Sequence, residues 1–148
     1  MADTFAENEN NPLLLKNQLC FPLYAAARQI AGLYAPLLKP LGLTYTQYLV
    51  FLVLWEEDGL KVGDLGERLF LDSGTLTPLL KKLEEKGLLE RRRSEDDERV
   101  VRVFLTGAGR DLRAKAVGIP AALSACVPLS EKDAGDLYRI LYTLLGVR

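Results

Sequence analysis

The two cysteines are the residues in this sequence with the most distinctive chemistry. Cys20 and Cys126 lie far apart, and the 148 residues contain no histidine. Without histidine or a Cys-x-x-Cys pair, we expect no metal site, no cofactor and no histidine-based catalysis. In a reducing compartment two such cysteines do not predict a structural disulfide. They are either small buried apolar residues or redox-active thiols.

Cys20 stands near the predicted start of a helix. Pro22 suits a first helical turn, and apolar residues recur at helical spacing from there to Leu37. The positive end of a helix dipole favours the thiolate form of a cysteine. A thiolate reacts with a peroxide to give a sulfenic acid, which then condenses with another thiol. Cys126 is the candidate for that second thiol.

Lysines and arginines are the second set of residues with a possible function. The net charge of −1 by itself gives no support to a nucleic-acid partner. The distribution of charge matters more than its sum, because basic side chains gather on one predicted helix and on the hairpin after it. The first turns of a helix can present side chains to base edges, and lysines further along can reach phosphates. The residues expected to contact DNA are Ser73, Thr75, Thr77, Lys81, Lys82 and Lys86 on the helix, and Arg91, Arg92, Arg93, Asp97 and Arg99 on the hairpin.

The elements that position these groups follow from hydrophobic periodicity and capping residues. The predicted helices cover 22–38, 48–56, 62–69, 73–86, 106–125 and 130–145, and the predicted strands cover 88–93 and 99–105. Thr44 or Thr46 caps the second of these helices, Pro12 suits one further helix start, and Pro120 predicts a kink. The order of helix, short helix, turn, helix and charged hairpin predicts a mainly α protein with a small β-hairpin wing, a winged helix-turn-helix.

Residues 43–110 resemble the MarR family of transcription regulators. The similarity is clearest at Leu83–Arg91, Ser94–Arg99 and Leu105–Gly109. The family's wing signature is an aspartate two residues before an arginine, here Asp97 and Arg99, and the resemblance implies that the aspartate orients the arginine toward DNA.

The resemblance extends over essentially the whole chain and implies a homodimer bound to double-stranded operator DNA. Residues 1–42 and 107–148 would form the dimerisation helices, and 43–106 would form the DNA-binding region. The apolar stripes from Leu13 to Leu19 and from Leu137 to Leu145 are available for the dimer contact.

The segment from Asn17 to Tyr24 is similar to the reactive-cysteine motif of the organic hydroperoxide sensors (OhrR) within that family. The resemblance implies that an organic hydroperoxide oxidises Cys20 and that the repressor then leaves DNA. It also implies that Tyr34 and Tyr45 hydrogen-bond the cysteine across the dimer, and that Cys126 can form an intersubunit disulfide. Pro22 stands where the subfamily often has alanine, which removes no reacting group.

Two other interpretations remain open. A MarR-type regulator controlled by a small apolar or phenolic ligand between its helices would leave the cysteines incidental. A thiol peroxidase could use Cys20 with Cys126 as resolving thiol, but the wing would then have no purpose, so we expect a regulator and not an enzyme.

The first eleven residues lack the basic and apolar regions of a secretion signal, and no apolar run reaches the length of a membrane helix. We therefore expect a cytoplasmic protein without a membrane partner.

Overall fold

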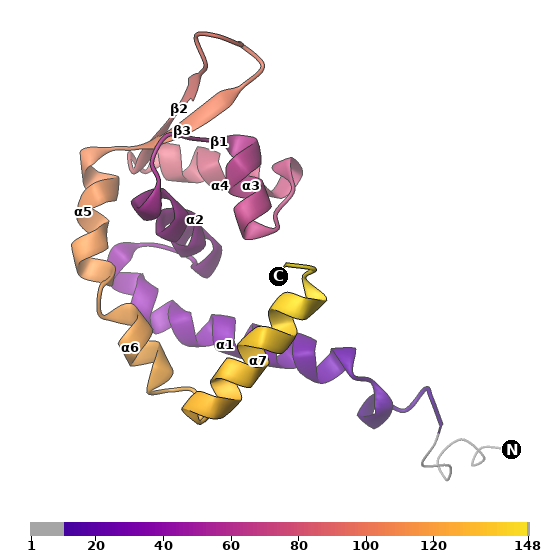
Figure 1. The fold of residues 1–148 in the computed structure, drawn as a ribbon. Helices are drawn as coiled ribbons and strands as arrows, with labels where there is room; N and C mark the ends of the chain where they lie inside the picture. The colour runs from indigo at the N-terminus through magenta and orange to yellow at the C-terminus, as the bar shows by residue number, and fades with distance from the viewer. Residues whose placement is uncertain (1–10, 148) are drawn as a thin grey trace, which may run out of the picture.

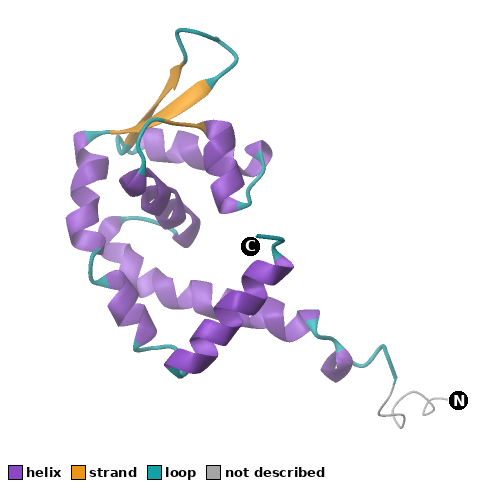
Figure 2. Cartoon of the chain, in the orientation of Figure 1, coloured by secondary structure: helices purple, strands orange, loops and turns teal. Residues whose placement is uncertain are grey.

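The computed structural model describes residues 11–147, which form a mainly helical chain with one small sheet (Figure 1). The helices and strands run, in chain order, as η1 (Leu15–Asn17), α1 (Cys20–Leu38), η2 (Lys39–Leu41), α2 (Tyr45–Glu56), β1 (Leu60–Lys61), α3 (Val62–Leu69), α4 (Ser73–Glu85), β2 (Leu89–Arg93), β3 (Val101–Leu105), α5 (Gly107–Ala116), α6 (Ile119–Ser124) and α7 (Glu131–Leu144). Figure 2 shows the sheet projecting from one end of a group of helices. The predicted winged helix-turn-helix is confirmed.

The first long helix begins at Cys20 and not at Pro12. The segment after Pro12 forms only a short 3-10 turn, η1, so the helix start suggested there is wrong. Leu13 and Leu19, at the two ends of the predicted N-terminal stripe, are 87% and 85% exposed, and this short segment buries no residue. Because so little of its apolar surface is covered, the segment has little to stabilise a longer helix.

Helix α2 begins three residues earlier than its periodicity predicts, and Thr44 is its cap. The Thr44 side chain accepts from the Gln47 backbone N–H, while the Gln47 side chain accepts from the Thr44 N–H. This reciprocal capping box fixes the helix start. Tyr48, Val50 and Phe51 on this helix are almost completely buried, so α2 forms the centre of the core.

Helices α3 and α4 form the helix-turn-helix. Leu76, Leu80 and Leu83 of α4 have no exposed surface, which fixes the orientation of this helix and leaves its other face in solvent. Gly87 follows α4 with φ of 72°, the left-handed conformation that ends a helix and that glycine adopts without strain.

The wing belongs to a three-stranded antiparallel sheet in the order β1-β3-β2, and not to a two-stranded hairpin as predicted. The missed strand β1 has two residues and pairs Leu60 with Val103. It is too short to show alternation in the sequence. The predicted alternation along β3 is confirmed, since Val103 and Leu105 are buried toward the helices.

The long helix predicted from Thr106 to Ala125 is two helices. Helix α5 ends at Ala116, and α6 begins at Ile119 with Pro120 in its first turn. Proline has no N–H to donate and its ring clashes with the carbonyl four residues earlier. The helix therefore stops before Pro120 instead of bending at it, and α6 then packs against α1.

The last helix begins as predicted, with the Ser130 side chain accepting from the Asp133 N–H. No residue of α7 is buried in the single chain, and Leu137, Ile140 and Leu144 are 38%, 47% and 68% exposed. Within residues 11–147 no single helix is long and apolar enough to cross a membrane; only α1 with η2, taken together with α2 and bent by 70°, passes such a test by length and composition.

Candidate DNA-binding and thiol sites

The start of the recognition helix α4 presents small polar side chains to solvent. Ser73 and Thr75 are exposed, and Thr77 is half-buried. Asp72 caps the helix, because its Oδ1 accepts from the Thr75 N–H at 2.7 Å, and this hydrogen bond lowers the pKa of the Asp72 carboxyl. The first turn is therefore held in place by an ionised cap at neutral pH. Lys81 and Lys82 follow on the exposed surface.

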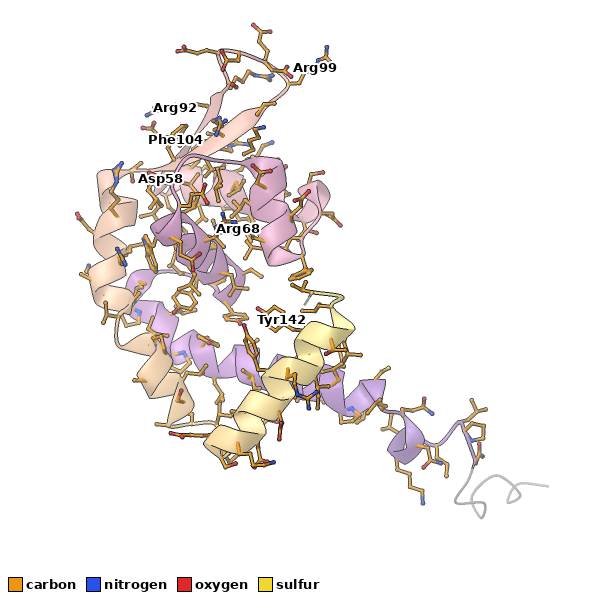
Figure 3. All side chains as sticks on the ribbon, viewed as in Figure 1. Asp58, Arg68, Arg92, Arg99, Phe104 and Tyr142 are labelled. Carbon is orange, nitrogen blue, oxygen red and sulfur yellow. The ribbon has the colours of Figure 1, made fainter. Side chains whose placement is uncertain are left out.

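The wing tip is shaped by Asp97. Its Oδ1 accepts from the Arg99 backbone N–H at 3.0 Å, and its carbonyl accepts from the Val100 N–H at 2.9 Å. Across the loop, Arg93 donates to the Glu98 carbonyl at 2.9 Å. The aspartate thus fixes the backbone from which Arg99 projects, and the Arg99 side chain stays exposed near the tip (Figure 3).

Arg92 lies on the exposed face of β2. Its guanidinium carbon is 4.9 Å from the centre of the Phe104 ring on β3, and its Nη2 lies 2.6 Å from the Glu90 carboxylate (Figure 3). A guanidinium above an aromatic ring keeps its N–H groups at the edge of the stack, where those on Nε and Nη2 of Arg92 donate to Glu90 at 3.1 and 2.6 Å. Arg92 is therefore oriented without being buried.

Arg91 is held within the fold. Its backbone N–H, Nε and Nη2 donate to the two oxygens of Glu84 on α4 at 2.8, 3.1 and 2.8 Å. These contacts lower the pKa of Glu84, with the Arg91 backbone N–H as the largest cause. Of the predicted wing arginines, this one links the wing to the recognition helix.

Lys86 also departs from its expected place. Its Nζ donates at 2.7 Å to the carbonyl of Gly42, on the connection between α1 and α2, and lies 3.4 Å from the Oε1 of Gln47 in the first turn of α2. The side chain is thus occupied by an acceptor within the chain and does not extend freely toward a phosphate.

The recognition helix and the wing meet around one hollow of about 400 Å³. Thr77 of α4, Lys61 of β1, and Arg91 and Arg99 of the wing line it, together with apolar side chains. The structure therefore brings together residues that the sequence assigned separately to the helix and to the wing.

Cys20 is the first residue of α1 and is exposed, as is Cys126, which follows α6; both are free thiols. Tyr34 lies fourteen residues after Cys20 on the same helix, a rise of about 21 Å. The Tyr34 hydroxyl therefore cannot hydrogen-bond the thiol of its own chain.

The two predicted tyrosines form one cluster. The Tyr34 and Tyr45 rings stack with centroids 4.4 Å apart. Burial, followed by the neighbouring Tyr45 and Tyr48, raises the pKa of Tyr34 to about 12. Burial also raises the pKa of Tyr45, and a hydrogen bond from Tyr34 partly offsets this. Both phenols are therefore protonated at neutral pH and can donate hydrogen bonds.

Tyr48 is a third member of this cluster, and it was not predicted from the sequence. Tyr48 is 2% exposed; its ring centre lies 5.8 Å from Tyr34 and 6.4 Å from Trp55. Its spacing of three residues from Tyr45 places both on one side of a helix, which is the signal that could have identified it. Trp55 is half-buried and donates its Nε1–H to the Gly109 carbonyl at 3.0 Å.

Known proteins support the same architecture. The family model described as transcriptional regulator SarA/Rot matches residues 32–115. The organic hydroperoxide resistance transcriptional regulator of Bacillus subtilis is 50% identical over 139 residues, which cover 94% of this chain and 95% of that protein.

Three solved structures of AbfR, a protein of Staphylococcus epidermidis, are also similar. The reduced protein bound to DNA matches with a TM-score of 0.77 and 37% identity, covering 89% of this chain and 90% of that one. The overoxidised protein bound to DNA matches with a TM-score of 0.70 and 40% identity, covering 88% of this chain and 94% of that one. The disulfide form matches with a TM-score of 0.63 and 39% identity, covering 88% of this chain and 92% of that one.

The matched lengths include the helix-turn-helix, the wing and most of the flanking helices. The relatives with these features are transcription regulators and not enzymes. The chain therefore belongs to the MarR-like family of DNA-binding winged-helix transcription regulators, in the branch that includes the organic hydroperoxide resistance regulators.

Proposed function

We propose that this chain is a homodimeric repressor that releases operator DNA when an organic hydroperoxide oxidises Cys20. The observation that carries the proposal is the position of Cys20, exposed at the first residue of α1 and far along that helix from the Tyr34–Tyr45 pair. A partner's Cys20 can occupy the place beside the tyrosines that the chain's own cysteine cannot reach. Of the predicted dimerisation segments 1–42 and 107–148, residues 1–10 and 148 lie outside the described residues. The described parts, 11–42 and 107–147, supply the dimer contact, for which the exposed apolar side chains of α7 are suited.

The organic hydroperoxide is the oxidant in the proposed reaction. The Cys20 thiolate attacks one peroxide oxygen, the O–O bond breaks, and the leaving alkoxide takes a proton to become an alcohol. The cysteine becomes a sulfenic acid. The Cys126 thiol of the partner subunit then forms an S–S bond with that sulfur and releases water.

Tyr34 and Tyr45 support the first step. Both hydroxyls are protonated at neutral pH. Because the Tyr34 O–H donates to Tyr45, the Tyr45 O–H is the one that can donate to a thiolate, and Tyr34 strengthens it as a donor. Such a bond favours the reactive, charged form of Cys20.

The disulfide, rather than further oxidation of a single cysteine, is the proposed releasing event. The relative AbfR has been solved bound to DNA both reduced and overoxidised, and separately in a disulfide form. By analogy, a bond between Cys20 and Cys126 would alter the spacing of the two recognition helices, which is about 34 Å in a dimer reading successive turns of DNA.

The proposed DNA contacts follow from exposure. Side chains at the start of α4 read base edges, Lys81 and Lys82 bind phosphates, and the wing enters the neighbouring groove or follows the backbone. The side chains assigned to bases are Ser73, Thr75 and Thr77, those assigned to the wing contact are Arg92, Arg93 and Arg99, with Asp97 shaping the tip, and Arg91 contributes by fixing the wing to α4.

The test compares three proteins on a duplex selected in vitro for binding to the reduced wild-type protein. Cumene hydroperoxide should release the wild type and leave Cys20→Ser bound. Cys126→Ser should still consume peroxide but should give no cross-linked dimer on a non-reducing gel. Peroxide-induced release of Cys20→Ser would contradict the sensor assignment.

A second function, control by a small apolar or phenolic ligand, is favoured by one feature. A hollow of about 500 Å³ lies beside Tyr45 and is lined mainly by apolar side chains of α1 and by Leu43. In the same assay, release of Cys20→Ser by a phenol such as salicylate, with no response of the wild type to peroxide, would favour this function.

A further inference from the structure

Lys86 ends the recognition helix and is bonded to a distant part of the chain. It is the C-cap residue of α4, and its backbone N–H donates to the Lys82 carbonyl at 3.2 Å. A cation is favourable at this end of a helix. Gly87 follows and turns the chain toward β2, so a shift of Lys86 moves both the end of α4 and the start of the wing.

The two acceptors of the Lys86 ammonium, Gly42 and Gln47, lie before and after Tyr45 in the sequence. Gly42 closes η2 in the left-handed conformation, with φ of 67°, and its carbonyl lies 2.7 Å from Nζ. Gln47 is 5% exposed, and its Oε1 lies 3.4 Å from Nζ and accepts from the Thr44 N–H at 3.1 Å. The same amide oxygen therefore serves the capping box of α2 and faces Lys86.

Tyr45 is the first residue of α2 and lies between these two acceptors in sequence. Its ring stacks on Tyr34. A change in the Tyr45 position must therefore act on the turn that Lys86 holds. Either the end of α4 follows that turn, or the hydrogen bonds to Gly42 and Gln47 break.

We propose that Lys86 is a positioning residue that couples the Tyr45 cluster to the recognition helix and the wing. This inference rests on the proposed function, because it names how the state of the thiol site reaches the DNA-binding surface. The 2.7 Å charged hydrogen bond is the main link, and the longer contact with Gln47 keeps the ammonium beside the capping box.

A role of Lys86 in phosphate binding would give a different result from the coupling role when the lysine is replaced. If Lys86 neutralised a phosphate, its removal would weaken DNA binding of the reduced and the oxidised protein alike and would lower the salt dependence by about one ion. If Lys86 couples the two sites, its removal changes the ratio of the two affinities and leaves the salt dependence unchanged.

The experiment measures Kd for the selected duplex before and after oxidation with one equivalent of cumene hydroperoxide. Lys86→Met keeps the aliphatic stem and removes the donors. We expect it to reduce the ratio of oxidised to reduced Kd at least fivefold, with an unchanged rate of Cys20 oxidation. Lys86→Arg should restore most of the ratio, because a guanidinium can reach the same carbonyl.

Lys82→Met is the matched control on the same helix. It should weaken both redox forms equally and reduce the salt dependence. A Lys86→Met ratio within twofold of wild type, or a salt dependence reduced as in Lys82→Met, would overturn the coupling role while leaving the sensor intact. If oxidation leaves the Kd of the wild type unchanged, the proposed function is wrong, and the coupling role is wrong with it.

Discussion

Glu84 of α4 and Arg91 of β2 join the recognition helix to the wing through three hydrogen bonds that use both carboxylate oxygens. The pair is largely covered, with side-chain exposures of 35% and 25%. Because one donor is the Arg91 backbone N–H, the contact fixes the path of the strand as well as its side chain. The angle between helix and wing is thus set before DNA binds.

Replacing Arg91 should therefore act on the fold more than on the charge that meets DNA. We expect Arg91→Ala to lower the free energy of unfolding by about 1 kcal/mol, the upper range for a well-formed ion pair near the surface. The salt dependence of DNA binding should stay close to wild type. Urea denaturation and a salt titration of Kd measure the two effects, and a full-ion drop in the salt slope would show that Arg91 contacts a phosphate directly.

Arg99 should behave in the opposite way. Its side chain is exposed at the wing tip, and only its backbone N–H is bonded to Asp97. Arg99→Ala should leave the free energy of unfolding unchanged while weakening DNA binding about tenfold and reducing the salt slope by about one. An affinity equal to wild type at low salt would remove Arg99 from the DNA interface.

Tyr34 provides a pH-dependent contribution to stability. Its pKa is raised to about 12 in the folded chain, against an ordinary value of 10.0. The folded state therefore holds the proton more tightly than the unfolded state. This contribution is fully present below pH 10 and is lost as the pH rises from 10 toward 12.

The measurement is a tyrosinate absorbance titration of the wild type and of Tyr34→Phe. The variant should lose a phenol that titrates near pH 12, and its stability should decline less between pH 10 and 12. If the ionisation step that Tyr34→Phe loses is instead centred near pH 10, Tyr34 titrates like an exposed phenol.

Gly109 permits the close packing of α5 against the end of the wing region. A Cβ at this position would lie 2.1 Å from the Leu88 carbonyl oxygen, and the Gly109 carbonyl itself accepts from Trp55. Gly109→Ala should destabilise the fold by about 3 kcal/mol, because a backbone atom must move.

Gly107→Ala, two residues earlier in the same helix, is the control. A Cβ there meets nothing within 4 Å, so this variant should be as stable as wild type or slightly more so. Thermal unfolding of the two variants tests the difference, and equal melting temperatures would show that the Leu88 segment can give way.

The local signals in the sequence predicted most of the elements. Thr44, Asp72, Thr106 and Ser130 each cap a helix with their own side chain, and Gly87 ends one by its backbone conformation. These interactions span only a few residues, so a pattern in the chain contains all the information they need. The same is true of Cys20 at the start of α1, which the sequence placed within two residues.

The tertiary structure decided which partners the charged side chains find. Lys86 and Arg91 both look like DNA contacts in the sequence, yet Lys86 binds the Gly42 carbonyl 44 residues away and Arg91 binds Glu84 on another element. The two-residue strand β1 exists only because β3 offers it a partner. A single charged residue or a two-residue strand carries no sequence pattern that identifies its partner. That partner comes near only when the core around α2 has packed the helices together.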